Sequence, residues 1–306
     1  MESDPWVERR LTASLARKFD RGDKRVLIGI GDDGAVVRTT SRTVVTCDPV
    51  VEGVHFEGST PPHLIGRKAV NRNLSDLAAM GARPTFLVVS ILFPGWLDPA
   101  GRQQLFRGIR DAARSADCTV VGGDVARTEG LLVVTVTALG EAPRRPLTRA
   151  GLRVGDSVHV SGPLGGSALG HHLRFSPRIQ IGRWLAGQRA VTAAIDISDG
   201  LLIDLATVLE ASGGLGAVLD VATLPITTAA RRAAETSERD ALCHVLSDGE
   251  DHELLFGVRG PLEPGGPLTA RARRPVGEVT AIPGIQLRHR DGSCEPCGLV
   301  GYQHDV

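Results

Sequence analysis

The chain has 306 residues, of which 42% are hydrophobic and 23% charged, and its formal net charge is zero. This composition is typical of a globular protein and excludes a disordered, collagen-like or coiled-coil chain, and the length indicates about two domains. The balanced charge argues against a nucleic-acid partner, and no run approaches the roughly 18 apolar residues that span a membrane. Residues 1–10 lack an apolar leader, so the sequence predicts a cytoplasmic protein.

The first half of the chain alternates between predicted helices and strands. Apolar residues at every fourth position predict a helix over residues 7–19. Further along, the patterns predict strands over 26–31 and 43–48, a helix over 68–81, a strand over 86–93, a helix over 99–116, and strands over 118–121 and 131–139. Such alternation is typical of an α/β or α+β domain.

A change of composition over residues 141–156 marks the best domain boundary. This segment has two prolines, four arginines and few apolar residues. The sequence therefore predicts an N-terminal domain over 1–142 and a C-terminal α/β domain over 150–306. The second half is predicted to contain a strand over 157–160, a Gly-rich turn over 162–166, a helix from 167, a strand over 190–197, a helix over 199–211, and strands over 217–221, 253–258 and 275–280.

The five cysteines do not form a recognisable framework. They are too few and too scattered for a set of disulfides. Cys294 and Cys297 form a single CxxC, which is weak evidence for zinc without a second pair. Pro296 lies between them, so this segment is predicted to be a surface turn.

Acidic residues gather where predicted strands end. They are Asp32, Asp33, Asp48, Asp76, Asp124, Asp196, Asp199, Asp248, Glu250 and Asp251. Any one of them could be a helix N-cap or a turn residue, and Ser198 or Asp199 could simply cap the following helix. The chain has only three lysines, so acids that converge would need another positive charge. A magnesium ion with a polyphosphate is the commonest solution.

Other nucleotide-binding signatures are missing. No Gly-Lys pair occurs, which excludes the P-loop motif, and the protein-kinase motifs are also absent. The Gly-rich segment 161–170 could hold an anion or could simply permit close backbone packing. No motif of a serine or cysteine nucleophile accompanies the histidines.

Eight segments, in order and over nearly the whole chain, resemble the thiamine-monophosphate kinase family of the aminoimidazole ribonucleotide synthetase-like superfamily. They are GIGDDGAVV, TCDPVVEGVHF, KAVNRNLSDLAAMGARP, VVGGDVAR, LTRAGLRVGDSVHVSG, HLRFSPRI, AIDISDGLLIDL and LSDGEDHELLF. NLSDLAAMGA and IDISDGL are the most specific of these. The resemblance implies a two-domain α/β (α+β) fold whose N-terminal sheet forms a barrel with its twin in a homodimer.

The resemblance also implies an activity and a set of site residues. The activity is transfer of the ATP γ-phosphoryl group to thiamine monophosphate, with Mg²⁺ as the metal. Asp33, Asp124, Asp196 and Asp199 match catalytic positions, and the implied metal ligands are Asp33, Thr46, Cys47, Asp48, Asp76, Asp124, Asp196 and Asp199. The implied ATP contacts are Gly123, Asp124, Arg149 and Ser198, and the implied substrate contacts are His55, Glu250 and Tyr302.

Three residues depart from the family pattern, and they keep alternatives open. Cys47 replaces the usual Thr, Asp248 the usual Gly and His252 the usual Tyr, and the segment before Arg178 is shortened. The alternatives are a sister enzyme of the same superfamily with another acceptor, a metal-dependent phosphatase and a nucleotide-binding subunit without activity. A selenophosphate synthetase is disfavoured because the first cysteine, Cys47, lies inside a predicted strand.

Overall fold

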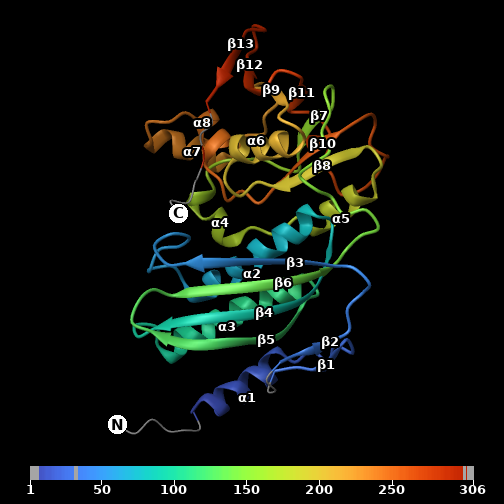
Figure 1. Cartoon of the computed structure of the whole chain (residues 1–306). Coiled ribbons are helices and arrows are strands. Elements are labelled where there is room, and N and C mark those ends of the chain that lie inside the picture. The colour runs from blue at the N-terminus through green and yellow to red at the C-terminus, as the bar shows by residue number, and fades with distance from the viewer. Residues whose placement is uncertain (1–6, 31–33, 299–300, 302–306) are drawn as a thin grey trace. The chain divides into compact units, whose positions relative to one another are not determined.

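The computed structural model describes residues 7–30, 34–298 and 301, and within them the chain divides into two compact units (Figure 1). Unit 1 comprises residues 1–77 and 83–142, and unit 2 comprises residues 78–82 and 143–306. Each unit has its own sheet.

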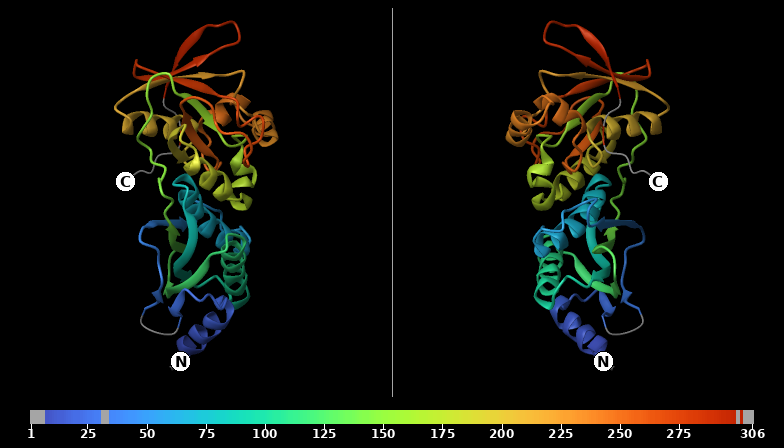
Figure 2. Two further views of the ribbon diagram at one scale, coloured as in Figure 1. Left: turned by 90° about the vertical axis from the view of Figure 1, so that its right-hand side faces the viewer. Right: turned by 90° about the vertical axis from the view of Figure 1, so that its left-hand side faces the viewer.

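The described part of unit 1 contains a four-stranded sheet in the order β3-β6-β4-β5. These strands are β3 (Thr43–Val51), β6 (Val133–Glu141), β4 (Arg83–Pro94) and β5 (Thr119–Thr128). Strands β4 and β5 are parallel and are joined by helix α3 (Pro99–Ser115), because a parallel pair needs a crossover connection. Helices α2 (Pro62–Ala79) and α3 lie together on one side of the sheet (Figure 2).

The two faces of this sheet differ in burial. Towards the helices, Val134, Val136 and Ala138 of β6 are fully buried. On the other face, Val45 of β3 is 61% exposed and Val88 of β4 is 37% exposed. Successive strand residues point to opposite faces, so apolar side chains stand on both faces while α2 and α3 cover only one.

Helix α1 (Val7–Phe19) packs at the β5 edge of the sheet, and a short pair of strands, β1 (Val26–Ile28) and β2 (Val36–Val37), follows it. Phe19 is 6% exposed and meets Phe106 of α3 edge-to-face, with 6.2 Å between ring centroids. This contact fixes the end of α1 beside the strand that carries Asp124.

Within its described residues, unit 2 has a seven-stranded mixed sheet in the order β13-β12-β9-β11-β7-β10-β8. The strands are β7 (Ser157–Val160), β8 (Val191–Asp196), β9 (Gly216–Asp220), β10 (Leu254–Val258), β11 (Gly277–Thr280), β12 (Gly284–Arg288) and β13 (Cys294–Cys297). Its helical segments are η1 (Ser167–Leu169), α4 (His171–Arg174), α5 (Ile179–Gly187), α6 (Leu201–Ala211), α7 (Thr228–Thr236) and α8 (Ala241–Ser247).

The pairing of β8 with β10 positions two loops that carry predicted site residues. The two strands are antiparallel, and Asp196 at the end of β8 lies opposite Leu254 at the start of β10. The loop that follows β8 and the loop that precedes β10 therefore meet at one end of the sheet. Apolar residues of one core cluster, including Ile195, Leu201 and Leu255, pack on one face of the sheet beside this end.

Several predicted elements were wrong in extent. The helix predicted over 68–81 begins six residues earlier, at Pro62. The strand predicted over 118–121 continues as β5 to Thr128, because its parallel partner β4 extends alongside it. The helix predicted from residue 167 is only a 3-10 turn and one helical turn, since Gly166 and Gly170 on either side adopt left-handed conformations.

The surface turn predicted around Cys294 and Cys297 was also wrong, because these residues form strand β13. Pro296 is tolerated since β13 is an edge strand and needs to pair only with β12. Every cysteine is free. Among the described residues, no helix combines the length and apolarity that a membrane span requires.

Candidate functional site

The loop after β8 presents two acidic residues at the start of helix α6. Asp196 is 5% exposed, and Asp199 is half-buried. The loop is held by Asp204, in the first turn of α6, whose Oδ2 accepts hydrogen bonds from the backbone N–H groups of Ser198 (3.0 Å), Asp199 (3.0 Å) and Gly200 (3.2 Å). One carboxylate thus fixes three consecutive backbone amides.

This arrangement corrects the capping interpretation. Gly200 stands at the N-cap of α6 without a side-chain cap, so neither Ser198 nor Asp199 caps the helix. Asp204 is 2% exposed, and its pKa is raised to about 8, first by burial and then by the negative charges of Asp196 and Asp199. Three acids therefore lie within electrostatic reach of one another, and a proton on Asp204 or a nearby cation would relieve their repulsion.

The loop before β10 is bonded to the same segment. The Glu250 N–H donates to the Ser198 carbonyl at 2.7 Å, and the His252 N–H donates to the Ile197 carbonyl at 2.8 Å. Glu250 and His252 both have left-handed backbones, with φ of 52° and 50°. Non-glycine residues adopt this conformation at a cost of about 1 kcal/mol or more, and such strain clusters at functional sites.

Asp251 and Asp248 tie this loop to the Gly-rich turn. The Gly165 N–H donates to the Asp251 carboxylate (2.9 and 3.1 Å), the Gly166 N–H donates to Asp248 Oδ2 (2.8 Å), and Ser167 Oγ donates to the Gly249 carbonyl (2.6 Å). The turn's amides therefore serve the protein's own carboxylates. Of the two interpretations of this segment, the structure favours close packing over an anion cradle.

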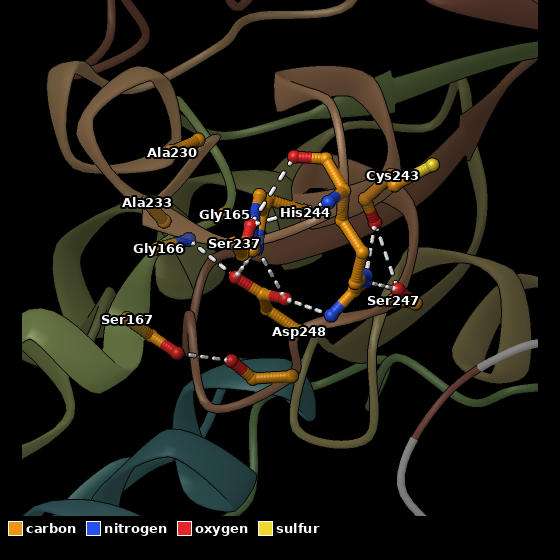
Figure 3. A network of polar contacts seen from close by, with 12 residues as sticks. Gly165, Gly166, Ser167, Ala230, Ala233, Ser237, Cys243, His244, Ser247 and Asp248 are labelled. Atoms are coloured by element: carbon orange, nitrogen blue, oxygen red, sulfur yellow. Dashed lines mark hydrogen bonds and ion pairs between the residues drawn. The ribbon is translucent and has the colours of Figure 1, made fainter. Parts of the chain in front are cut away.

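Asp248 lies at the centre of a wider network (Figure 3). Its carboxylate contacts His244 Nδ1 at 2.9 Å and Arg239 Nη1 at 3.2 Å, while His244 Nε2 lies 2.9 Å from Ser237 Oγ. Asp248, where the family usually has glycine, thus contributes a carboxylate that contacts both the turn before α8 and the Gly-rich turn.

In unit 1, one group of predicted site residues lies between β3 and α2. Thr46 Oγ1 donates to Asp76 Oδ2 at 2.5 Å, and the Asp48 N–H donates to Asn73 Oδ1 at 3.0 Å. Cys47 alternates to the opposite face of β3, where Thr137 Oγ1 donates to its Sγ at 3.3 Å. The structure brings Thr46 and Asp76 together but directs the Cys47 thiol away from them.

Gly123 and Asp124 form a separate group on β5, at the opposite edge of the sheet from β3. Three inter-strand spacings of about 4.8 Å place the two edges roughly 14 Å apart. Asp124 is exposed and, with Gly123, lines a cavity of about 600 Å³ that is also bounded by Ile30 and Gly34. A Cβ at Gly123 would lie 1.9 Å from the Val89 carbonyl oxygen, so only glycine fits there.

The remaining predicted residues are dispersed. The His55 carbonyl accepts a hydrogen bond from the fully buried Lys68 Nζ, and His55 Nδ1 accepts one from the Val51 N–H at 3.1 Å. The backbone carbonyl of Arg149 accepts a hydrogen bond from Ser212 Oγ at the end of α6, whereas Ser198 precedes its start, so unit 2 does not bring the two together. Asp33 and Tyr302 lie outside the described residues.

Sequence reasoning missed the two acids that hold the site loops, Asp204 and Asp251, as supporting residues. Their signal was weak: Asp204 is one more acid in a helix, and Asp251 is one of three acids in SDGED. Among the described residues, no group of three or more His, Cys, Asp or Glu side chains is arranged to hold a metal ion.

Comparisons with known proteins agree with these features. The family model of the AIR synthase related protein, N-terminal domain, matches residues 31–142. The thiamine-monophosphate kinase of Rhodopirellula baltica is 40% identical, covering 92% of this chain and 93% of its own, and that of Escherichia coli K12 is 36% identical over 95% and 96%.

Solved structures show the same relationship. Thiamine-monophosphate kinase from Stenotrophomonas maltophilia K279a is similar with a TM-score of 0.74 and 30% identity over 94% of this chain and 96% of its own. The structure of AaThiL complexed with AMPPCP and TMP is similar with a TM-score of 0.75 and 27% identity, covering 99% of both chains. The hydrogenase maturation protein HypE in complex with ATP gives 0.77 at 17% identity over 96% of this chain and 94% of its own, which shows the fold alone. The predicted aminoimidazole ribonucleotide synthetase-like fold is thereby confirmed, and the chain belongs to the thiamine-monophosphate kinase family.

Proposed function

We propose that this protein phosphorylates thiamine monophosphate to thiamine diphosphate with ATP as the donor. The observation that carries the proposal is the loop 196–200, whose acids are fixed by Asp204 and by the loop that presents Glu250. Preorganised acidic loops of this kind suit a reaction in which positioning and charge neutralisation dominate. The likeness to AaThiL complexed with AMPPCP, an ATP analogue, and TMP supports the same reaction.

The nucleotide is proposed to bind at the cavity beside β5. Gly123 has no side chain, so its backbone is accessible at the cavity wall, and the Asp124 carboxylate lies on the same wall. Asp33 is also a proposed contact. Ser198 and Arg149 of unit 2 also remain proposed nucleotide contacts.

Magnesium fits the donor set of this chain. Carboxylate oxygens at Asp48, Asp76, Asp124, Asp196 and Asp199, with Asp33, Thr46 and the Cys47 backbone, are the hard ligands that this ion prefers. The absence of a complete protein cage among the described residues agrees with magnesium's habit of binding through one or two carboxylates plus substrate phosphates. When bound, magnesium would neutralise phosphate charge during the transfer.

The chain's own residues have a limited chemical task in this mechanism. The acceptor is a phosphate oxygen of thiamine monophosphate that is already ionised, so no strong general base is required. Asp124, Asp196 and Asp199 would supply carboxylate oxygens to magnesium, and the Arg149 guanidinium would add positive charge for the phosphates. His55, Glu250 and Tyr302 are proposed to bind the acceptor, and the left-handed backbone of Glu250 fixes the direction from which it does so.

A homodimer is part of the proposal. The face of the unit 1 sheet that α2 and α3 leave uncovered carries Val45, Val88 and Leu92, which are 61%, 37% and 40% exposed. A second copy of the same sheet would bury these residues and close a barrel. In this proposal residues 1–142 form the domain that binds ATP and makes the dimer, and residues 150–306 form the C-terminal α/β domain. The need for ATP favours the cytoplasm as its location.

A product assay tests the proposal. Purified protein is incubated with ATP, Mg²⁺ and thiamine monophosphate, and the products are separated by chromatography. We expect ADP and thiamine diphosphate in equal amounts, with both abolished by EDTA. Release of inorganic phosphate from thiamine monophosphate without ATP would instead indicate a phosphatase, and ATP binding without either product would indicate a nucleotide-binding subunit.

A further inference from the structure

The side chain of His252 contacts one of the proposed metal ligands from inside the protein. His252 Nδ1 lies 3.3 Å from Asp196 Oδ2, and both side chains are buried, at 2% and 7% exposed. The antiparallel pairing of β8 with β10 produces this contact, because Asp196 faces Leu254, two residues after His252. Because Asp196 is an acceptor, Nδ1 must carry the proton.

The ring of His252 is held from a second direction. Phe175 stacks on it with 4.0 Å between ring centroids and an interplanar angle of 17°. Phe175 is itself 3% exposed and directly follows helix α4. The stack fixes the plane of the imidazole, and with it the direction of the Nδ1–H bond.

This position is maintained at an energetic cost. His252 has a left-handed backbone, and its Nε2 has no hydrogen-bond partner among the described residues. A buried polar atom without a partner costs about 1–3 kcal/mol. If this side chain only filled space, an apolar ring would do so without that cost. The feature that distinguishes His252 from such a ring is therefore its Nδ1–H group beside Asp196.

We infer that His252 is a positioning residue that orients the Asp196 carboxylate for metal binding, an inference that rests on the proposed function. Groups that hydrogen-bond to a metal-binding carboxylate fix its orientation, and their loss typically weakens metal affinity 10–100-fold. Phe175 acts through His252 by keeping the imidazole plane in register with the carboxylate.

Two substitutions separate the positioning role from mere packing. In His252→Asn the side-chain N–H₂ occupies the place of Nδ1, and asparagine tolerates a left-handed backbone. In His252→Gln the amide reaches instead towards the place of Nε2. The dissociation constant of Mn²⁺, a probe for the hard oxygen site, is measured by electron paramagnetic resonance on the full chain with AMPPCP. Asp196→Asn is the reference for loss of the ligand itself.

We expect His252→Asn to bind Mn²⁺ within about threefold of the wild type and His252→Gln to bind it at least tenfold more weakly. The kcat of the Gln variant should fall while its KM for thiamine monophosphate stays unchanged. If His252→Gln binds Mn²⁺ as tightly as the wild type while Asp196→Asn binds it weakly, the positioning role of His252 is wrong. The assignment of Asp196 as a metal ligand would still stand. Wild-type affinity in Asp196→Asn would overturn the metal assignment beneath it.

Thermal melting of each variant shows whether it is folded. If His252→Gln does not fold, Phe175→Leu is measured instead. This change keeps the His252 Nδ1–H donor but removes the stacking that fixes the plane of the imidazole. Its Mn²⁺ affinity should fall about threefold, and an unchanged affinity in folded Phe175→Leu would contradict the inference.

Discussion

Two acids of unit 2, Asp204 and Asp251, and one acid of unit 1, Asp124, are built into the protein in opposite ways. In unit 2, Asp204 and Asp251 are almost fully buried and receive hydrogen bonds from backbone amides. In unit 1, Asp124 is exposed on a cavity wall. A buried carboxylate has lost its water and must be compensated by the chain itself, whereas an exposed one keeps its water until a ligand displaces it. The difference separates Asp204 and Asp251, which hold the loops, from Asp124, which is free to meet a ligand.

The sharpest test of this contrast is Asp124→Asn. Because Asp124 is exposed, its replacement should leave the melting temperature unchanged. The turnover should fall about 100–1,000-fold, as for the loss of one preorganised charge at a phosphoryl-transfer site. Steady-state kinetics and thermal melting measure the two quantities. Asp111→Asn, at an exposed acid of α3 in the same unit, is the control that should change neither. Near wild-type turnover in Asp124→Asn would remove Asp124 from the site.

Asp204→Ala should show the opposite behaviour. It removes the acceptor of three backbone N–H groups in a buried loop, and each unsatisfied group costs about 1 kcal/mol or more. We expect a loss of about 3 kcal/mol in the free energy of unfolding, measured by denaturant titration. Asp204→Asn keeps an acceptor oxygen and should lose much less. Equal losses in the two variants would mean that the hydrogen bonds do not hold the loop.

The raised pKa of Asp251 predicts how the free energy of unfolding depends on pH. Burial raises its pKa to about 8 from an ordinary value of 3.8, so the folded state favours the protonated form. The resulting stability is present below about pH 4 and is lost progressively as the pH rises towards 8. Relative to Asp251→Asn, the wild type should lose about 1 kcal/mol per pH unit between pH 5 and 8.

Melting curves at several pH values measure this difference. Glu235→Gln, at an exposed acid on α7, serves as the matched control and should follow the wild type. Parallel pH curves for the wild type and Asp251→Asn would show that the buried carboxyl does not titrate in this range.

The smallest effect is expected for Asp248→Gly, which introduces the residue usual in the family. The change removes the acceptor of the Gly166 N–H and the contacts with His244 and Arg239. Because this site is partly open to water, the loss should be only about 1 kcal/mol. The KM for thiamine monophosphate should rise by less than about threefold, since Glu250 lies two residues away. A large change in KM would make Asp248 part of the acceptor site.

The sequence predicted the kinds of residue at the site better than their arrangement. Asp196 ends β8 as expected, whereas Asp124 lies inside β5 rather than after it, and the roles of both acids stay predictions. Sequence spacing does not show strand order, however. The order β3-β6-β4-β5 separates Asp124 from Asp48 by two intervening strands, and no local pattern indicates this.

The supporting residues were harder to predict for a physical reason. Asp204 and Asp251 act through hydrogen bonds to Ser198 and Gly165, and the latter partner is 86 positions away in the sequence. Hydrophobic periodicity carries no information on such bonds. Strand β5 was predicted too short because Gly122, Gly123 and Asp124 are poor strand formers that its pairing with β4 overrides.

The buried Lys68 has a practical consequence for experiments. It is 0% exposed, and the other two lysines, Lys18 and Lys24, both lie within the first 24 residues. Reagents that couple to lysine amines would therefore attach fluorophores, resins or sensor surfaces only near the beginning of the chain. Unit 2 contains no lysine, so such reagents would leave all of its side chains unlabelled.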